Sequence, residues 1–276
     1  MSLTLLALAP LLGAADVGGD TGTIALKAQH MYDGQRTIRN AVLLIRDGKV
    51  LAAGPATGLQ VPDGAEVIDL GDRWILPGLV AAGSSLPERD RVGEDTIRTD
   101  VFAADAFDPF GNYDRYLMHG VTSVYLTPGS GRLVSGRGAV AKLGGPASGR
   151  MVSRDAGLQV QVGDPAEGAP DKYTPPLPPS GDDPVRGAEP QLPSSRMGAF
   201  MALRRSLRDG TLQEGDEGLW RIGCADVASI RSALDLAREF GLEIVLEGAQ
   251  EGHLLADEIA ATGYPVVVQI PLRPGS

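Results

Sequence analysis

The fold of this chain is decided by the stretch WILPGLVAAGSS, which runs from Trp74 to Ser85. Its residues 75–82 are apolar without polar alternation, which predicts a parallel strand covered on both faces. Pro77 and Gly78 are tolerated near the start of such a strand. We therefore expect one buried strand here, followed by a loop of the kind in which α/β proteins place their chemistry.

Strands and helices alternate after this stretch. Strands are predicted at Val121–Leu126, Ala139–Leu143, Leu219–Ala225, Leu242–Gly248 and Tyr264–Pro271, and helices at Arg115–His119, Ala199–Leu207, Val227–Phe240 and Glu251–Thr262. Short glycine turns separate these elements, as after Phe240. This alternation predicts a parallel (β/α) barrel resembling a TIM barrel.

Before the stretch, short strands and tight turns dominate. Strands are predicted at Thr23–Gln29, Ala41–Ile45, Lys49–Ala53 and Glu66–Leu70. Asp47-Gly48 between two of them is a strong hairpin signal. The chain is therefore divided into a leader and linker at 1–22, a small β subdomain at 23–72 and an α/β domain at 73–276.

Composition limits the possible functions. The 276 residues are 43% hydrophobic and 22% charged, which is typical of a globular protein. The formal charge of -10 argues against a nucleic-acid surface, because phosphate binding needs clustered cations. A single cysteine, Cys224, excludes an internal disulfide. No apolar run is long enough for a transmembrane helix.

Two segments stand apart from the predicted elements. Met1–Ala15 has the apolar stretch and small residues of a signal peptide, which predicts export to the periplasm or the medium. The alternative is a disordered apolar tail on a cytoplasmic protein. Residues 164–194 are rich in proline and predict an extended connecting loop.

Several motifs resemble the imidazolonepropionase-like branch of the metal-dependent amidohydrolase superfamily. The first barrel strand of that family reads Pro-Gly-Leu-Ile-Asp-x-His-x-His. Pro77–Ser85 keeps its Pro-Gly-Leu start and has Val80 in place of the isoleucine, but it lacks the aspartate and both histidines. HGVTSVYL at 119–126, the PGSG loop at 128–131 and the entry into the helix at 193–198 are also similar. The resemblance implies a β-sandwich at 23–72 and hydrolysis of carbon–nitrogen bonds other than peptide bonds.

The metal ligands of the family are missing. Aligned with the family, its four ligand histidines fall at Gly83, Ser85, Gly223 and Gly248, with Ala225 beside the third. Glycine has no side-chain donor, and a serine hydroxyl is a poor ligand for zinc. The family would use zinc or another divalent metal, but we expect no cofactor here. His30, His119 and His253 lie elsewhere and are interpreted as structural.

The resemblance also implies that the barrel is incomplete. The chain ends before the family's late barrel strand, so the match is to a degenerate and C-terminally truncated member. An incomplete barrel would expose the strand edge near Val266–Ile270. A second chain covering that edge is therefore an expected partner.

Three functional hypotheses follow. The first is a catalytically inactive homologue that acts as a binding or partner module. The alternative is an active hydrolase of cyclic amides that uses Glu247, Asp226 and Lys142 as substitute groups. The third is a small-molecule binding protein, for which the glycine-rich loop at 127–138, with Ser130, Gly131 and Arg132, is the best candidate surface.

Overall fold

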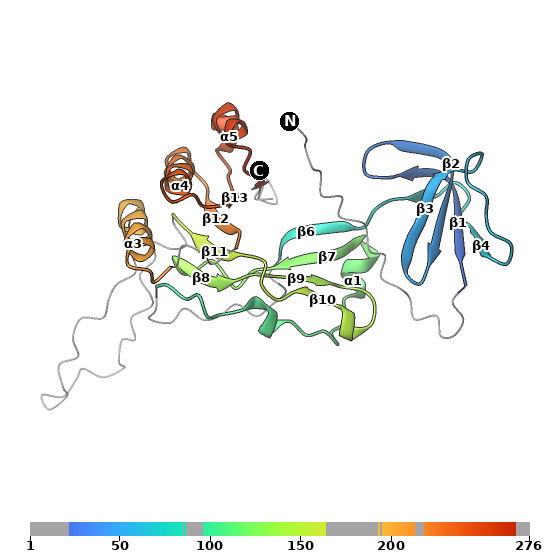
Figure 1. Ribbon diagram of the computed structural model, residues 1–276, viewed down its shortest axis with the longest axis horizontal. Coiled ribbons are helices and arrows are strands. Elements are labelled where there is room, and N and C mark those ends of the chain that lie inside the picture. The colour runs from blue at the N-terminus through green and yellow to red at the C-terminus, as the bar shows by residue number, and fades with distance from the viewer. Residues whose placement is uncertain are drawn as a thin grey trace, which may run out of the picture. The chain divides into compact units, whose positions relative to one another are not determined.

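The computed structural model describes residues 22–84, 86, 96–163, 193, 195–212 and 218–268 (Figure 1). The chain divides into two compact units. The first comprises 1–81, 108–124 and 141–152, and the second comprises 82–107, 125–140 and 153–276. The predicted β subdomain at 23–72 lies within the first unit, which also takes in two later segments of the chain.

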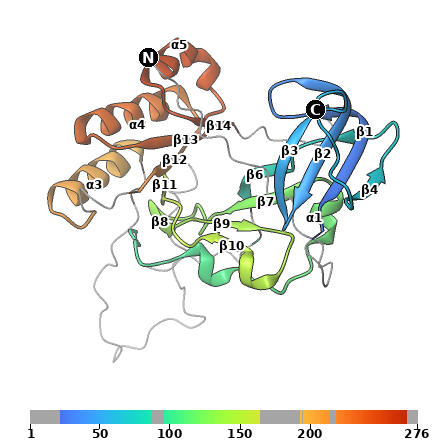
Figure 2. The same ribbon diagram turned by 45° about the vertical axis from the view of Figure 1, so that its right-hand side comes forward.

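A five-stranded sheet forms the N-terminal part of the first unit (Figure 2). Its strands are β1 (Ile24–Tyr32), β2 (Thr37–Arg46), β3 (Lys49–Pro55), β4 (Glu66–Asp69) and β5 (Trp74–Ile75). The first three are antiparallel neighbours, and β4 and β5 pair in parallel with β1. Asp47 and Gly48 both have positive φ, 51° and 68°, so the predicted tight hairpin is confirmed.

Apolar side chains alternate between the two faces of this sheet. Met31, Ile38 and Leu43 belong to one buried cluster, whereas Val42 and Leu44 belong to another. Successive residues of a strand point to opposite faces, so β2 contributes to both clusters. The described residues of this segment form one sheet, and the predicted sandwich stays a prediction.

The expectation for Trp74–Ser85 is wrong in two respects. The stretch forms two strands rather than one, because β5 joins the first sheet and β6 (Leu79–Ser84) joins a second. Pro77, which has no N–H to donate, lies between them. Strand β6 is also not covered on both faces, since Leu79 is 60% and Val80 51% exposed. It is an edge strand of its sheet among the described strands.

The second sheet has the order β10-β9-β7-β6. Its other strands are β7 (Val121–Leu126), β9 (Ala139–Lys142) and β10 (Met151–Ser153). Helix α1 (Asp114–Met118) precedes β7 and ends at His119, followed by Gly120 with φ 81°. This glycine termination before a strand confirms the sequence prediction for the segment.

The third sheet lies wholly in the second unit and contains the parallel strands. Its order is β14-β13-β12-β11-β8, with β8 (Val134–Arg137), β11 (Leu158–Gln161), β12 (Trp220–Cys224), β13 (Ile244–Gly248) and β14 (Val266–Val268). Strands β11 to β14 are parallel, and β8 is antiparallel to β11. Because the described strands form three sheets, closure into a barrel stays a prediction.

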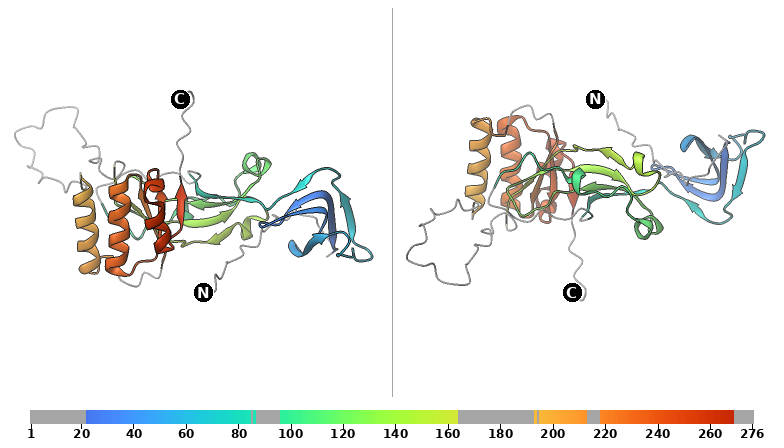
Figure 3. Two further views of the ribbon diagram at one scale, coloured as in Figure 1. Left: turned by 90° about the horizontal axis from the view of Figure 1, so that it is seen from above. Right: turned by 90° about the horizontal axis from the view of Figure 1, so that it is seen from below.

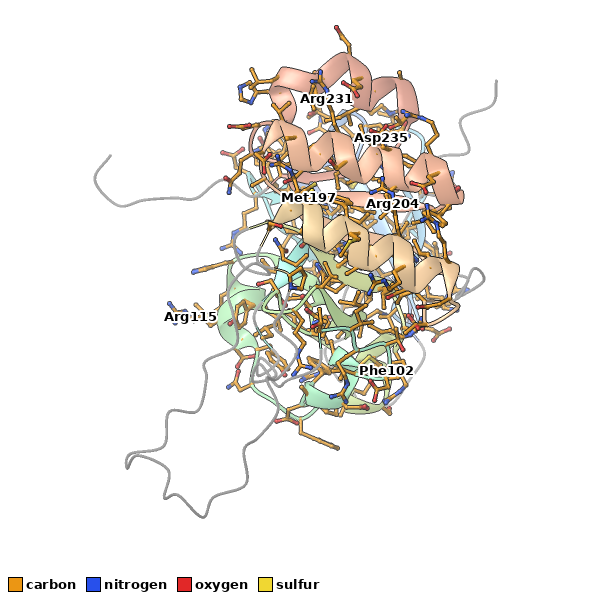
Figure 4. All side chains as sticks on the ribbon, turned by 90° about the vertical axis from the view of Figure 1, so that its left-hand side faces the viewer. Phe102, Arg115, Met197, Arg204, Arg231 and Asp235 are labelled. Atoms are coloured by element: carbon orange, nitrogen blue, oxygen red, sulfur yellow. The ribbon has the colours of Figure 1, made fainter. Side chains whose placement is uncertain are left out.

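Helices connect the parallel strands of this sheet. They are α3 (Arg196–Arg208), α4 (Val227–Phe240) and α5 (Ala256–Thr262), and they lie side by side along one face of the sheet (Figure 3). Figure 4 looks onto their outer surface, where Met197, Arg204, Arg231 and Asp235 are labelled. Three successive β-α-β units are therefore present. The alternation predicted the second and the third, whereas strand β11 of the first was not predicted.

Local signals set the ends of these helices. The Ser195 hydroxyl accepts from the N–H of Gly198 at 3.2 Å and caps α3, and the Asp226 carboxylate accepts from Ala228 and Ser229 at 3.0 Å and caps α4. Gly241, with φ 67°, ends α4. The predicted bounds of α4 are confirmed.

The predicted helix at 251–262 is instead a 3-10 turn (Gly252–Leu255) followed by α5. Further 3-10 turns lie at Ala103–Ala106 and Ala147–Gly149.

The parallel strands have one apolar face and one polar face. Residues that alternate along β12 and β13, such as Ile222 and Leu246, pack against the helices in the main buried cluster. The residues between them point to the opposite face, where Gln159, Arg221 and Glu247 are buried as well. A buried polar face in the middle of a sheet requires internal hydrogen bonds, and these organise the site described below.

Several predicted features lie outside the described residues. They are the signal peptide, Ser85, the proline-rich loop at 164–194 except Pro193, and residues 269–271 of the last predicted strand, which include the end of the predicted open edge. In the part of the chain that the structure describes, no helix has the length and apolar character to cross a membrane.

Candidate functional site

A pocket of about 720 Å³ lies at the C-terminal ends of the parallel strands in the second unit. Gln159 and Gln161 of β11, Gly223 of β12 and Glu247 of β13 line it. Thr127, Gly129 and Ser130 from the loop after β7 also contribute. Open α/β sheets and barrels bind their ligands at this end of the strands, so this pocket is the candidate site.

Three of the four predicted ligand positions line this one pocket. They are Gly83, Gly223 and Gly248, and Ala225 lines it too. The fourth, Ser85, lies outside the described residues. Gly223 and Gly248 lie 140 and 165 residues after Gly83 in the sequence, and the fold brings all three to one pocket. The ligands of a metal must come together in this way.

Two of these glycines do not suit a histidine, Gly223 because of the space around it and Gly248 because of its backbone conformation. A Cβ built on Gly223 would lie 2.0 Å from Oε1 of Gln161, because that amide lies over the glycine from the neighbouring strand. Gly248 has φ 84°, a backbone conformation that residues with a Cβ rarely adopt. A histidine at either position would require the surroundings to rearrange.

An ion pair occupies the buried face beneath the pocket. One Nη2 of Arg221 donates to Oε1 of Glu247 at 3.3 Å and to the carbonyl of Ala82 at 2.6 Å. The two charged side chains are only 8% and 9% exposed. Nε2 of Gln159 donates to the other carboxylate oxygen of Glu247 at 2.9 Å. The buried carboxylate is thus neutralised and hydrogen-bonded inside the protein.

Tyr125 completes this network. The guanidinium carbon of Arg221 lies 3.8 Å from the centroid of its ring, within the range of a cation–π contact. The phenol donates to Oε1 of Gln159 at 3.4 Å. Burial raises the pKa of Tyr125 well above its ordinary value, so the phenol stays protonated at neutral pH. Nε of Arg221 has no hydrogen-bond partner among the described residues.

The donor set does not fit a divalent metal. In the described ranges, no group of three or more His, Cys, Asp or Glu side chains could hold one. Glu247 is engaged by Arg221 and Gln159. Burial raises the pKa of the Cys224 thiol to about 12, so the thiol is protonated at neutral pH. These residues therefore do not form a metal site.

The three histidines do not line the pocket. His30 and His119 belong to the first unit, and His30 stacks on Trp74 with ring centroids 4.6 Å apart. His253 belongs to the second unit and is exposed, with Nδ1 3.2 Å from the carbonyl oxygen of Gln250. None of them is among the residues that line the pocket.

Some of the other predicted site residues line the pocket and others do not. Glu247, Asp226 and Ser130 line the pocket. Gly131 and Arg132 do not, and Arg132 is 5% exposed. Lys142, at the end of β9, belongs to the first unit and is also absent from the lining. The three proposed substitute catalytic groups are therefore not all lining residues of one pocket.

Several residues of the site were not predicted from the sequence, among them Gln159, Gln161, Arg221 and Tyr125. A signal exists for two of them. Arg221 is a charge between Trp220 and Ile222 inside a strand, and Gln159 alternates with Leu158 and Val160 in the same way. Polar residues at alternate positions of a buried strand indicate a buried polar face.

Asp226 lines the pocket, but its carboxylate caps helix α4. Burial opposes its ionisation, but the hydroxyl and N–H of Ser229, the Arg196 guanidinium and the N–H of Ala228 outweigh this and lower its pKa. The Arg196 contact is 3.2 Å long. Its carboxylate is therefore occupied as a helix cap.

This assignment predicts that Asp226→Ala destabilises the second unit by about 1 kcal/mol near neutral pH. The folded-state pKa is lowered, so the stabilisation is present above the ordinary carboxyl pKa of about 3.9 and disappears as the pH falls through the lower folded value. Urea unfolding of both proteins between pH 7 and pH 2 measures this difference. An undiminished difference at pH 2 would contradict the capping role.

The backbone at Gly248 gives a second prediction. Gly248→Ala should cost roughly 1–2 kcal/mol, because an L-residue is strained at φ 84°. Gly223→Ala should cost less, since only the flexible end of Gln161 must move. Thermal unfolding of the two variants compares them directly. Equal losses of stability in the two variants would show that the backbone conformation at Gly248 does not require glycine.

The comparisons with solved structures bear on this site. A crystal structure of an amidohydrolase from Thermotoga maritima MSB8 matches with a TM-score of 0.72 and 26% sequence identity, over 90% of this chain and 70% of that one. The structure resembles an amidohydrolase. This supports the resemblance to the superfamily that the motifs indicate.

Two further solved structures match with much lower TM-scores. One is N-acetyl-D-glucosamine-6-phosphate deacetylase from Mycobacterium smegmatis, with a TM-score of 0.27 and 14% identity over 90% of this chain and 49% of that one. The other is an adenosine deaminase from Xanthomonas campestris with bound zinc, with a TM-score of 0.29 and 12% identity over 88% and 53%. No family model and no curated protein matches the sequence.

Proposed function

We propose that this protein is an amidohydrolase-like protein of the imidazolonepropionase-like branch that binds a small molecule without metal-dependent hydrolysis. One observation carries the proposal. Gly83, Gly223 and Gly248, where the branch would place metal-ligand histidines, line the same pocket and supply no side-chain donor. A pocket of about 720 Å³ remains, which is large enough for a ligand of ordinary size.

The chemistry of the pocket supports binding rather than turnover. Hydrolysis of an amide requires an activated water, which a metal supplies by lowering the pKa of the water that it binds. Without a metal, a carboxylate would have to act as the general base. Glu247 is held by Arg221 and Gln159, and Asp226 by the start of α4, so neither carboxylate among the described residues is placed for that task.

A second candidate function is an active hydrolase of cyclic amides. It is favoured by one observation, that Glu247 is a buried carboxylate at a strand end in the pocket. In that case Glu247→Gln should abolish turnover, because an amide cannot accept the proton of the attacking water. The control Glu243→Gln changes a carboxylate that does not line the pocket.

The test measures the turnover of one set of compounds. Cyclic amides such as hydantoin and dihydrouracil are incubated with the full-length protein, with and without added zinc, manganese or nickel. The proposal predicts no product above the rate of the buffer control in any condition. Product formation that Glu247→Gln abolishes and Glu243→Gln retains would replace the proposal with the hydrolase function.

We further propose that another chain covers the open edge of the third sheet. Strand β14 pairs with β13 and is the last strand of the described sheet, and Val266 and Val268 are 38% and 58% exposed. Such an edge is prone to pair with other strands. Sedimentation at micromolar concentration should then show an assembly larger than the monomer, and a monomer throughout the dilution series would contradict the idea.

A further inference from the structure

The pocket also indicates which kind of molecule it binds. We propose that its ligand is an uncharged small molecule that carries hydrogen-bond donors and acceptors together, as a polyol or a carboxamide does. This inference rests on the proposed function, since it describes a pocket that binds and does not hydrolyse.

The charges at the pocket are already balanced within the protein. Glu247 forms its ion pair with Arg221 at 3.3 Å, and Asp226 forms one with Arg196 at 3.2 Å. The Glu247 carboxylate also accepts a hydrogen bond from Gln159, and the Asp226 carboxylate accepts one from the first turn of α4. A ligand therefore meets carboxylates whose charge is compensated.

An ionic ligand gains little from such a pocket. In the described part of the chain, no lysine or arginine is among the lining residues, so an anion would lose its hydration without meeting a cation. A cation would meet carboxylates that Arg221 and Arg196 already neutralise. Its desolvation would again not be offset, because an ion is expensive to transfer from water without a new partner.

Uncharged polar groups of the pocket are available for a ligand. The amides of Gln161 and Gln250 and the hydroxyl of Ser130 line it, and no side-chain hydrogen bond to described residues occupies them. Each of these groups can both donate and accept. The amide of Gln161 lies over Gly223, which faces it from the paired strand β12. A ligand with both donors and acceptors satisfies them best.

Two series of probes matched in shape test the charge preference. Glucose, glucuronate and glucosamine form the first, and benzamide, benzoate and benzylamine the second; each is titrated into the full-length protein at pH 7 by calorimetry. We expect the uncharged member of at least one series to bind at least tenfold more tightly than its charged relatives. Tighter binding of a charged member, or no binding by either series, would overturn the inference.

A charge introduced at Gln161 sharpens the test. Gln161→Glu keeps the shape of the side chain but adds an uncompensated carboxylate to the pocket, so the uncharged probe should bind at least tenfold more weakly and the ammonium probe more tightly. Gln60→Glu is the matched control, because Gln60 is exposed in the first unit. Unchanged probe affinities in Gln161→Glu would exclude this amide from the binding site.

The proposed function and the ligand preference can be contradicted by different results. Metal content and turnover of cyclic amides are measured on the same protein preparations that are used for calorimetry. A bound metal or product formation contradicts the proposed function itself. Metal-free protein that shows no turnover but prefers a charged probe contradicts only the inference about the ligand.

Discussion

Arg221→Met should destabilise the second unit by roughly 3–5 kcal/mol, because it leaves the buried carboxylate of Glu247 without its cation. Both side chains are more than nine-tenths buried, so water cannot replace the lost partner. Trp220 is buried in this unit and Trp74 is half exposed in the other. Urea unfolding followed by fluorescence in a Trp74→Phe background therefore reports the relevant transition.

A double variant separates the ion pair from simple loss of packing. Arg221→Met combined with Glu247→Gln removes both charges and should recover roughly 1–3 kcal/mol relative to Arg221→Met alone. Arg238→Met is the matched control, since its pair with Asp235 is 67% and 62% exposed. That control should change stability by less than about 1 kcal/mol. Equal losses in the single and the double variant would show that the pair is not coupled.

Leu246→Ala should cost about 2–5 kcal/mol, because it opens a cavity between the parallel sheet and its helices. Leu246 is fully buried and belongs to the main cluster, which includes Ile222, Ile230 and Leu234. Its neighbour Glu247 points to the opposite face of β13. The variant should therefore lose stability while probe binding by its folded fraction is retained, which unfolding and calorimetry measure together.

Leu254→Ala provides the control for this substitution. Leu254 lies in the same unit but is 63% exposed, so its removal should change stability by no more than about 0.5 kcal/mol. Loss of probe binding in folded Leu246→Ala protein would contradict the separation of the apolar face from the polar face of the sheet.

Local sequence signals predict β12, α4 and β13 of the second unit, whereas β8 and β11 were not predicted. The bounds of α4 follow from the apolar spacing around Ile230 and Leu234 and from the terminating Gly241, which are properties of the segment itself. The stretch Trp74–Ser85 was misjudged because an apolar run does not reveal what covers it. Strand β6 is an edge strand of its sheet among the described strands, and Leu79 and Val80 are exposed although their sequence is that of a buried strand.

Prediction of the site from the sequence was limited in the same way. Gly83, Gly223 and Gly248 could be aligned as one set because motifs of the family surround them, and they do line one pocket. The Arg221–Glu247 pair could not be predicted in this way. It depends on the register of β12 and β13, in which Gly223 lies opposite Glu247 and Arg221 opposite Val245, so the guanidinium reaches the carboxylate diagonally across the sheet.

The metal content of the purified full-length protein is the most direct test of the central claim. The protein is dialysed against trace zinc, manganese and nickel, then against metal-free buffer, and analysed by elemental mass spectrometry. The loss of side-chain donors at Gly83, Gly223 and Gly248 predicts an occupancy near zero. An occupancy near one metal per chain would contradict the account and revive a metal-dependent hydrolase.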